Sequence, residues 1–262
     1  MDTNNVLEVY NNLMTHGRDY WWSATRALTI KHAASIEWRS PVLELGGQNG
    51  IVSEIIGRPI QLMVDTDPDV TKDSEGYKIY KMVMKGSAED LSDVTGQFKT
   101  VVGLNMIYHC NRVKVLNEVY KILEPGGIAI FTDTPGYNGI LTYSFLARCH
   151  GSQYHSDIYR TMECDGHMVN IVPTGWWDHF VDKGKWEIIE KRPYASVDMC
   201  LIARAHYTLR AASSRGVIDN NLFDEVLDLA HRRNEIPGML EKDNELCEKA
   251  GAVFLMVVLR KK

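Results

Sequence analysis

The sequence has little of what membrane, secreted or nucleic-acid-binding proteins require. Its 262 residues contain no apolar run that approaches the length of a membrane span. The first residues, MDTNNVLEVYNN, lack the basic segment and apolar stretch of a secretory signal. The net charge of −5 provides no general attraction to phosphate backbones or anionic lipids. We therefore expect a cytoplasmic protein that has neither a membrane nor a nucleic acid as its partner.

Paired cysteines, repeats and low-complexity tracts are also missing. The cysteines are odd in number and none has C-x-x-C spacing: Cys110, Cys149, Cys164, Cys200 and Cys247. This pattern fits reduced thiols better than a disulfide framework. With 45% hydrophobic residues the chain is long enough to bury one sizeable core. The sequence therefore predicts a single domain with additions.

What the sequence does contain is an alternation of strand and helix patterns. Buried strands are predicted at 42–45, 61–64, 81–84, 99–104 and 128–132. Between the last two, NRVKVLNEVYKIL places Val113, Leu116, Val119, Tyr120 and Leu123 at helical spacing. Such an alternation favours a parallel sheet whose strands are joined by crossover helices.

The stretch VLELGGQNGIV joins the first predicted strand to a cluster of glycines. Gly46, Gly47 and Gly50 follow this strand, and Asp65 should end the neighbouring one. Open parallel sheets bind ligands beyond the carboxyl ends of their strands, where glycines let the backbone approach the ligand. A carboxylate there can accept hydrogen bonds from a ribose diol. A nucleoside pocket and a simple tight turn both remain open as interpretations.

Further segments extend this pattern in a fixed order: VLELGGQNG, VDTDP, GSAEDL, FKTVVGLNMIYHC and LNEVYKILEPGGIAIF. Together they resemble the class I S-adenosylmethionine-dependent methyltransferases, in the broad group that modifies small molecules. The resemblance covers about Pro41 to Thr134. It implies a Rossmann-like three-layer α/β sandwich with a mostly parallel seven-stranded sheet. It also implies S-adenosyl-L-methionine as cofactor, a small-molecule acceptor, and a monomer or homodimer.

The resemblance implies a role for each matching position. Glu44 would order the glycine loop near the methionine ammonium, Asp65 would hold the ribose hydroxyls, and Thr66 would lie beside the adenine face. The remaining implied cofactor-binding residues lie in the glycine loop, in the segment that borders adenine, and at the end of the fourth strand. They are Gly46, Gly47, Gly50, Ser87, Ala88, Glu89, Asn105 and Met106.

Gln48 departs from the family, which usually has glycine at that position. A positive φ there would cost on the order of 1–2 kcal/mol for a residue with a side chain. We therefore expect Asn49 or a glycine to take any positive φ, and the Gln48 side chain to point away from the cofactor. The alternative of an NAD(P) dehydrogenase requires G-x-G-x-x-G, which residues 46–50 do not supply.

The other segments are predicted to surround this core within one domain, 1–262. We expect a helical cap at 1–40, a cofactor-binding core at 41–135, a substrate lid insertion at 137–173, a core helix and strand at 174–192, a second helical excursion at 195–250 and a final strand at 252–260. A long insertion at the ligand edge of a sheet is typical of a lid.

Histidines near the predicted ligand edge are candidates for a general base. Methyl transfer to a hydroxyl requires removal of its proton, and histidine titrates near neutral pH. His167 in the lid and His109 after the fourth strand are the leading candidates, followed by His155. The alternatives are a solvated lid whose histidines only form hydrogen bonds, and a His109 that only packs or caps the next helix.

A metal site is not predicted, although Cys164 and His167 have C-x-x-H spacing. No second ligand pair has zinc-finger spacing. Three classes of function remain open. The first is transfer of a methyl group to an O or N atom of a small molecule, such as a metabolite, sugar or natural product. The others are a related fold that uses the cofactor in another reaction or in regulation, and a scaffold that has lost it.

Overall fold

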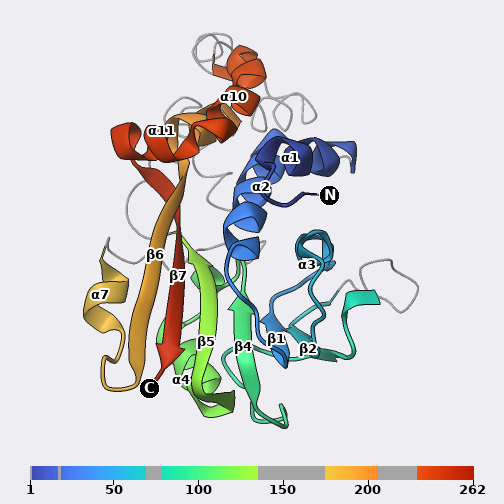
Figure 1. Ribbon diagram of the computed structural model, residues 1–262, viewed down its shortest axis with the longest axis vertical. Coiled ribbons are helices and arrows are strands. Elements are labelled where there is room, and N and C mark those ends of the chain that lie inside the picture. The colour runs from blue at the N-terminus through green and yellow to red at the C-terminus, as the bar shows by residue number, and fades with distance from the viewer. Residues whose placement is uncertain (1, 17–18, 69–77, 135–174, 204, 206–228) are drawn as a thin grey trace, which may run out of the picture.

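The computed structural model describes residues 2–16, 19–68, 78–134, 175–203, 205 and 229–262 (Figure 1). Its centre is a seven-stranded sheet of order β3-β2-β1-β4-β5-β7-β6. The strands are β1 (Val42–Leu45), β2 (Leu62–Asp65), β3 (Val83–Lys85), β4 (Phe98–Gly103), β5 (Leu123–Asp133), β6 (Trp186–Ser196) and β7 (Ala252–Lys261). The first five pair in parallel, whereas β7 is antiparallel to both β5 and β6. The predicted mostly parallel, Rossmann-like sandwich is confirmed.

Helices cover both faces of the sheet. They are α1 (Val6–Thr15), α2 (Tyr20–Ala34), α3 (Ile51–Ile56), α4 (Arg112–Ile122), α7 (Trp176–Phe180), α10 (Ile236–Glu241) and α11 (Asp243–Ala250), with the 3-10 turns η2 (Ile107–His109) and η3 (Arg232–Glu235). One apolar cluster joins the sheet to α1, α2, α3 and α10, and a second joins it to α4 and α7. These two clusters are the apolar interfaces between the sheet and the helices on its two faces.

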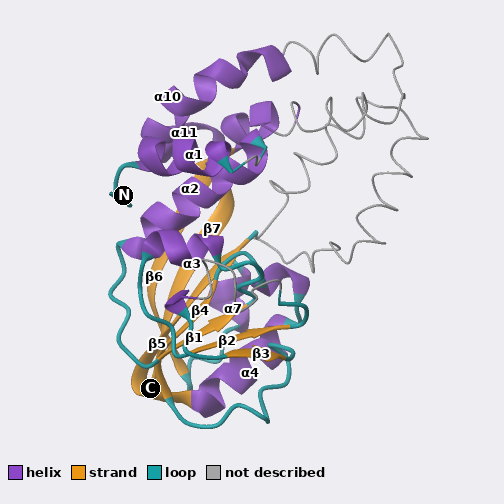
Figure 2. Ribbon diagram, turned by 90° about the vertical axis from the view of Figure 1, so that its right-hand side faces the viewer, coloured by secondary structure: helices purple, strands orange, loops and turns teal. Residues whose placement is uncertain are grey.

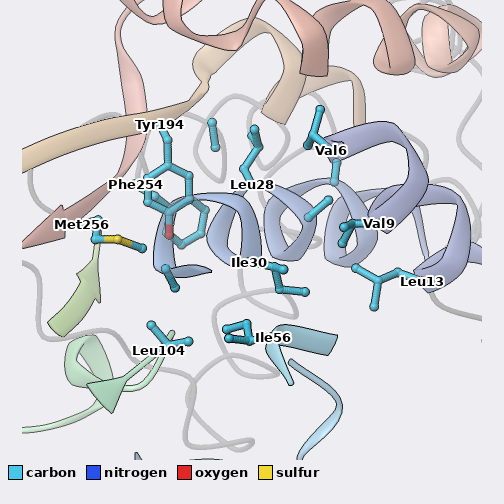
Figure 3. Packing of buried hydrophobic residues seen from close by; sticks show 14 of the residues in the cluster. Val6, Val9, Leu13, Leu28, Ile30, Ile56, Leu104, Tyr194, Phe254 and Met256 are labelled. Carbon is cyan, nitrogen blue, oxygen red and sulfur yellow. The ribbon is translucent and has the colours of Figure 1, made fainter. Parts of the chain in front are cut away.

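The helical amino-terminal segment lies at one end of the sheet. Figure 2 shows α1, α2, α10 and α11 together at the end opposite the carboxyl terminus. Since β7 runs toward that terminus and is antiparallel to β5, these helices face the carboxyl ends of the parallel strands. In Figure 3, Leu28 and Ile30 of α2 lie in one apolar cluster with Leu104, which follows β4. Apolar packing therefore fixes α2 to the sheet.

Short polar side chains begin several of these helices. Asn5 accepts a hydrogen bond from the backbone of Glu8 at the start of α1, and Asp19 accepts one from Trp22 at the start of α2. These contacts satisfy backbone N–H groups that have no partner within the helix. By contrast, α3 follows Gly50 and has no side-chain cap. The start of α3 is thus set by the glycine loop.

The crossover helix α4 differs from its predicted apolar stripe. Val113 is 51% exposed, whereas Val115 is buried. The cause lies at the first residue of the helix, because Arg112 turns inward to an ion pair with Asp133. The buried face therefore follows Arg112, Val115 and Val119.

Candidate functional site

The carboxyl ends of β1, β2, β4 and β5 form one edge of the sheet, here called the carboxyl edge. The strand β1 pairs with β2 on one side and with β4 on the other. The order of the strands along the chain reverses between β1 and β4, which is where open α/β sheets bind ligands. Gly46 follows β1, Asp65 ends β2, and Asn105 lies just after β4. The structure thus brings predicted site residues from three segments to one edge.

The glycine loop passes close to the end of β4. Gly46 has a φ of 72°, and a Cβ added to it would lie 2.6 Å from the Cβ of Met106. Gly47 is equally restricted, since its added Cβ would lie 2.8 Å from the Cγ of Met63. Gly50 has a φ of 75° at the start of α3. The turn itself requires these glycines, so the ligand-binding interpretation depends on the polar groups around them.

Gln48 adopts the left-handed conformation itself, with a φ of 46°. The expectation that Asn49 or a glycine would take the positive φ at this point of the loop was therefore wrong. The physical reason is a tertiary contact, because the backbone N–H of Gln48 donates a hydrogen bond of 2.8 Å to Oδ2 of Asp65. This bond fixes the orientation of the peptide at a conformational cost of about 1–2 kcal/mol. The Gln48 side chain is exposed.

The Asp65 carboxylate organises the backbone around it. Its Oδ2 accepts from Gln48, and its Oδ1 accepts the backbone N–H of Asp67 at 2.9 Å. Each carboxylate oxygen can accept more than one hydrogen bond, so capacity for a diol remains. Asp65 is partly exposed and Thr66 beside it is exposed. Both predicted residues are accessible to a ligand.

The segment after β3 is anchored to α4. Ser87 Oγ accepts the backbone N–H of Glu89 at 3.1 Å, and Ala88 between them is buried. The Glu89 carboxylate accepts the backbone N–H of Asn111 at 2.7 Å and lies 3.6 Å from Nζ of Lys114. Glu89 therefore connects this segment to the start of α4. A role for residues 87–89 beside adenine stays a prediction.

Glu44 is buried on β1 beneath the glycine loop. Its Oε1 accepts a hydrogen bond from the Ser53 hydroxyl and its Oε2 accepts one from the Tyr80 hydroxyl, both at 2.6 Å. Burial raises the pKa of Glu44 to about 7, although both hydrogen bonds act to lower it and the charge of Asp65 raises it further. Sequence reasoning missed Ser53 and Tyr80. A polar residue within the apolar stretch IVSEII was the available signal for Ser53.

Asn105 presents an unpaired amide at the carboxyl edge. It has a φ of 60°, and its backbone N–H donates to Oγ1 of Thr132 at 2.6 Å. Its side-chain nitrogen and oxygen are buried and have no hydrogen-bond partner among the described residues. An unpaired buried polar group costs about 1–3 kcal/mol. Such a group is complementary to a polar ligand.

A second buried carboxylate lies at the end of β5, and sequence reasoning missed it. Asp133 accepts bonds of 2.9 and 2.6 Å from Nε and Nη2 of Arg112. It also accepts bonds from the indole of Trp177 at 2.9 Å and from the backbone of Thr134 at 2.7 Å. These contacts join α4, α7 and β5. In this network the buried guanidinium of Arg112 supplies the counter-charge of Asp133.

Of the predicted bases, His109 lies at the carboxyl edge. It ends the turn η2 and is exposed, and its ring centroid lies 4.4 Å from that of Tyr108. His155 and His167 lie outside the described residues, as does the predicted lid. Within the described ranges, no group of three or more His, Cys, Asp or Glu side chains could hold a metal ion. None of the described helices combines the length and the apolar character that crossing a membrane requires.

Comparison with known proteins places a family match over this site. Residues 43–131 match the model of the methyltransferase domain. No curated protein matches the chain in sequence. A putative sarcosine dimethylglycine methyltransferase from Galdieria sulphuraria has a similar structure, with a TM-score of 0.51, 14% identity and coverage of 91% of this chain and 85% of the other.

Two further solved structures share the fold. A possible histamine N-methyltransferase from Thermotoga maritima has a TM-score of 0.52 and 14% identity, with coverage of 99% of this chain and 100% of the other. The [4+2]-cyclase SpnF has a TM-score of 0.53 and 11% identity, with coverage of 90% and 80%. Identities this low show the fold alone. The match to the methyltransferase domain covers residues 43–131, which carry the carboxyl edge, and these solved structures share the fold.

Proposed function

We propose that the protein transfers a methyl group from S-adenosylmethionine to an O or N atom of a small-molecule acceptor, such as a metabolite, sugar or natural product. The observation that carries this proposal is the buried, unpaired amide of Asn105, which stands at the carboxyl edge close to the glycine loop. The cofactor supplies a methyl group on a sulfonium, which a nucleophile displaces in line. The protein must therefore align the acceptor and exclude water.

The residues at the carboxyl edge fit this cofactor. Asp65 has free acceptor capacity for the ribose hydroxyls, and Gly46 lets the glycine loop pass close to Met106 at the same edge. Glu44 places a carboxyl group beneath the loop, where its negative charge favours a cationic ligand. The amide of Asn105 can donate to a carboxylate or accept from an amine or hydroxyl. Roles for Gly47, Gly50, Thr66, residues 87–89 and Met106 remain part of the proposal.

A small acceptor is supported by charge and by the fold relatives. The net charge of −5 gives no general affinity for nucleic acids. The names of two relatives, a putative sarcosine dimethylglycine methyltransferase and a possible histamine N-methyltransferase, refer to small amines. We propose a cytoplasmic enzyme that acts as a monomer or homodimer.

A base is needed when the acceptor atom carries a proton at the working pH. His109 is the candidate among the described residues, because it is exposed at the carboxyl edge. His167 and His155 stay predictions. If either His109 or His167 is the base, its Ala variant should keep cofactor affinity and lose on the order of 10²–10⁴ in rate. Full activity of both single variants and of the double variant would remove histidine catalysis at these positions.

The proposal is tested by two measurements on the same protein. Calorimetry with S-adenosylhomocysteine measures cofactor binding, and a labelled methyl group is followed onto a panel of small hydroxyl and amine acceptors. Binding with transfer to one acceptor class supports the proposal. Asn105→Ala should then lower transfer, whereas Asn117→Ala on the outer face of α4 should not.

One alternative has specific support. The [4+2]-cyclase SpnF shares this fold, and Gln48 stands where the family usually has glycine. Cofactor binding without transfer to any acceptor of the panel would favour such a non-methyl-transfer role. No binding at all would favour a scaffold that has lost the cofactor.

A further inference from the structure

We propose that Tyr80 and Ser53 are positioning residues of the cofactor site, which hold the buried Glu44 carboxylate beneath the glycine loop so that the cationic cofactor binds with release of a proton from Glu44. The proposal rests on the cofactor assignment and is independent of the acceptor. The sequence analysis assigned no role to the hydroxyl of Ser53 or of Tyr80, and it did not consider a protonated state of Glu44.

The three side chains come from separate segments and meet in the interior. Glu44 is on β1, Ser53 is in the first turn of α3, and Tyr80 precedes β3. All three are buried, and both hydroxyl-to-carboxylate distances are 2.6 Å. An added Cβ on Gly47 would lie 3.1 Å from the Glu44 carboxyl carbon. The carboxyl group therefore lies directly against the loop backbone.

The hydrogen bonds depend on the charge of Glu44. An ionised carboxylate accepts from both hydroxyls, whereas a protonated carboxyl carries an O–H donor on one oxygen, so that one of these bonds is weakened or reversed in direction. Burial and Glu44 raise the pKa of Tyr80, so the phenol stays protonated and acts as a donor. Burial raises the pKa of Glu44 to about 7, against the effect of both hydroxyls. The two charge states of Glu44 are therefore close in free energy at neutral pH.

The described surroundings supply no cation to Glu44. In the sheet register Met63 of β2 and Val102 of β4 lie beside it. The carboxylate of Glu54 on α3 is exposed, and the charge of Asp65 raises the pKa of Glu44 further. Lys78 and Lys81, on either side of Tyr80, are exposed as well. Among the described residues no positive charge faces Glu44, so we propose the ligand as the source of its counter-charge.

A cationic ligand favours the ionised form of Glu44 and lowers its pKa. Below the pKa that Glu44 has in the ligand-free protein, binding has to expel the proton, so the affinity for the cation falls as the pH decreases. One linked proton changes the affinity about tenfold per pH unit below the midpoint. Above the midpoint Glu44 is already ionised, and the dependence disappears.

The test is calorimetry with S-adenosylhomocysteine, which keeps the ammonium group, from pH 5.5 to 9 in two buffers of different ionisation enthalpy. The parent should release a proton and lose affinity below about pH 7. Glu44→Gln should bind without this pH dependence. Tyr80→Phe and Ser53→Ala each remove one donor to the carboxylate, so their midpoints should move to higher pH while their affinities approach that of the parent at pH 9.

The matched control is Tyr120→Phe on α4, where the ring packs against Trp186. This variant should keep the profile of the parent. An equal loss of affinity at every pH in Tyr80→Phe would identify a merely structural role and overturn the proposal. If Tyr80→Phe does not fold, Ser53→Ala decides by the same criterion.

The outcome also separates this inference from the cofactor assignment. Binding by the parent with no pH dependence, or with no proton released, would overturn the role of Glu44 and leave the methyltransferase proposal intact. A parent protein that binds no S-adenosylhomocysteine at any pH would overturn both.

Discussion

Two buried carboxylates lie toward the carboxyl edge, and their partners differ in kind. Glu44 on β1 accepts from the hydroxyls of Ser53 and Tyr80, which carry no charge. Asp133 at the end of β5 accepts from the guanidinium of Arg112 and from the indole of Trp177. The negative charge of Asp133 is therefore balanced by Arg112, whereas no positive charge among the described residues balances that of Glu44.

This difference separates a structural role from a ligand-binding role. A buried ion pair is strongly destabilised when one partner is removed, since the remaining charge is left uncompensated. A carboxylate that has only neutral donors keeps the option of losing its charge, and it gains most when a cation arrives. The partners of a buried carboxylate thus indicate its role better than its burial does.

The largest expected effect is on the balanced pair. Arg112→Met should lower the free energy of unfolding by about 3–5 kcal/mol, because it leaves Asp133 buried without a counter-charge. Denaturant titration measures this change. The control is Arg260→Met, which breaks an exposed pair with Glu187 and should cost less than about 1 kcal/mol. Equal effects of the two variants would contradict the contrast between buried and exposed pairs.

The next largest effect concerns the stability of the cofactor-free protein and depends on the charge of Glu44. Folding raises the pKa of Glu44 from its ordinary value of 4.5 to about 7. Its contribution to stability is therefore fully present below pH 4.5 and is lost as the pH rises through 7. Relative to Glu44→Gln, the parent should lose up to about 3 kcal/mol across this window. Unfolding titrations at pH 4.5 and 8 test this, and parallel profiles would count against it.

A third carboxylate at the same edge sharpens the comparison. Asp65 is partly exposed and accepts only backbone N–H groups among the described residues. Asp65→Ala should weaken cofactor binding by about 1.5–3 kcal/mol, because the ribose hydroxyls lose a charged acceptor. Asp67→Ala removes an exposed carboxylate next to it and serves as the control in calorimetry. Unchanged affinity in Asp65→Ala would sink its assignment to the ribose.

The smallest effect concerns the loop between these carboxylates. Gln48→Gly should stabilise the protein by up to about 1 kcal/mol, because glycine adopts the positive φ without strain. Its backbone N–H still donates to Asp65, so cofactor affinity should not rise. Asn49→Gly is the control, since Asn49 lacks a positive φ and should gain no stability. A large gain in affinity for Gln48→Gly would show that the side chain excludes the ligand.

Much of the sheet could be predicted because its parallel strands are short apolar runs that end at glycines or acids. The predicted strands at 42–45, 61–64 and 99–104 correspond closely to β1, β2 and β4. The position of β7 between β5 and β6 could not be read from periodicity. Strand order depends on packing between distant segments, and only the family resemblance pointed to a seven-stranded sheet.

The positions of residues at the carboxyl edge were predictable where one residue ends or follows one strand, as for Gly46, Asp65 and Asn105, whereas their ligand roles stay predictions. The site was not predictable where two distant side chains meet. Tyrosine and tryptophan also occur at other positions of this sequence, so nothing local marks Tyr80 or Trp177 as partners of buried acids. The prediction for the backbone of Gln48 was wrong for a related reason. A hydrogen bond from its own N–H to Asp65 outweighs the local preference for asparagine or glycine at a positive φ.

The place of β7 in the sheet also bears on how the chain is made. Strands β1 to β5 can pair with one another as they leave the ribosome. Among the described strands, β6 pairs only with β7, which follows it in the chain. Until residues 252–261 are synthesised, β5 has an unpaired edge along a buried apolar strand and β6 has no partner. Such edges are templates for association between chains. The newly made protein therefore depends on its folding environment for the interval between β5 and β7.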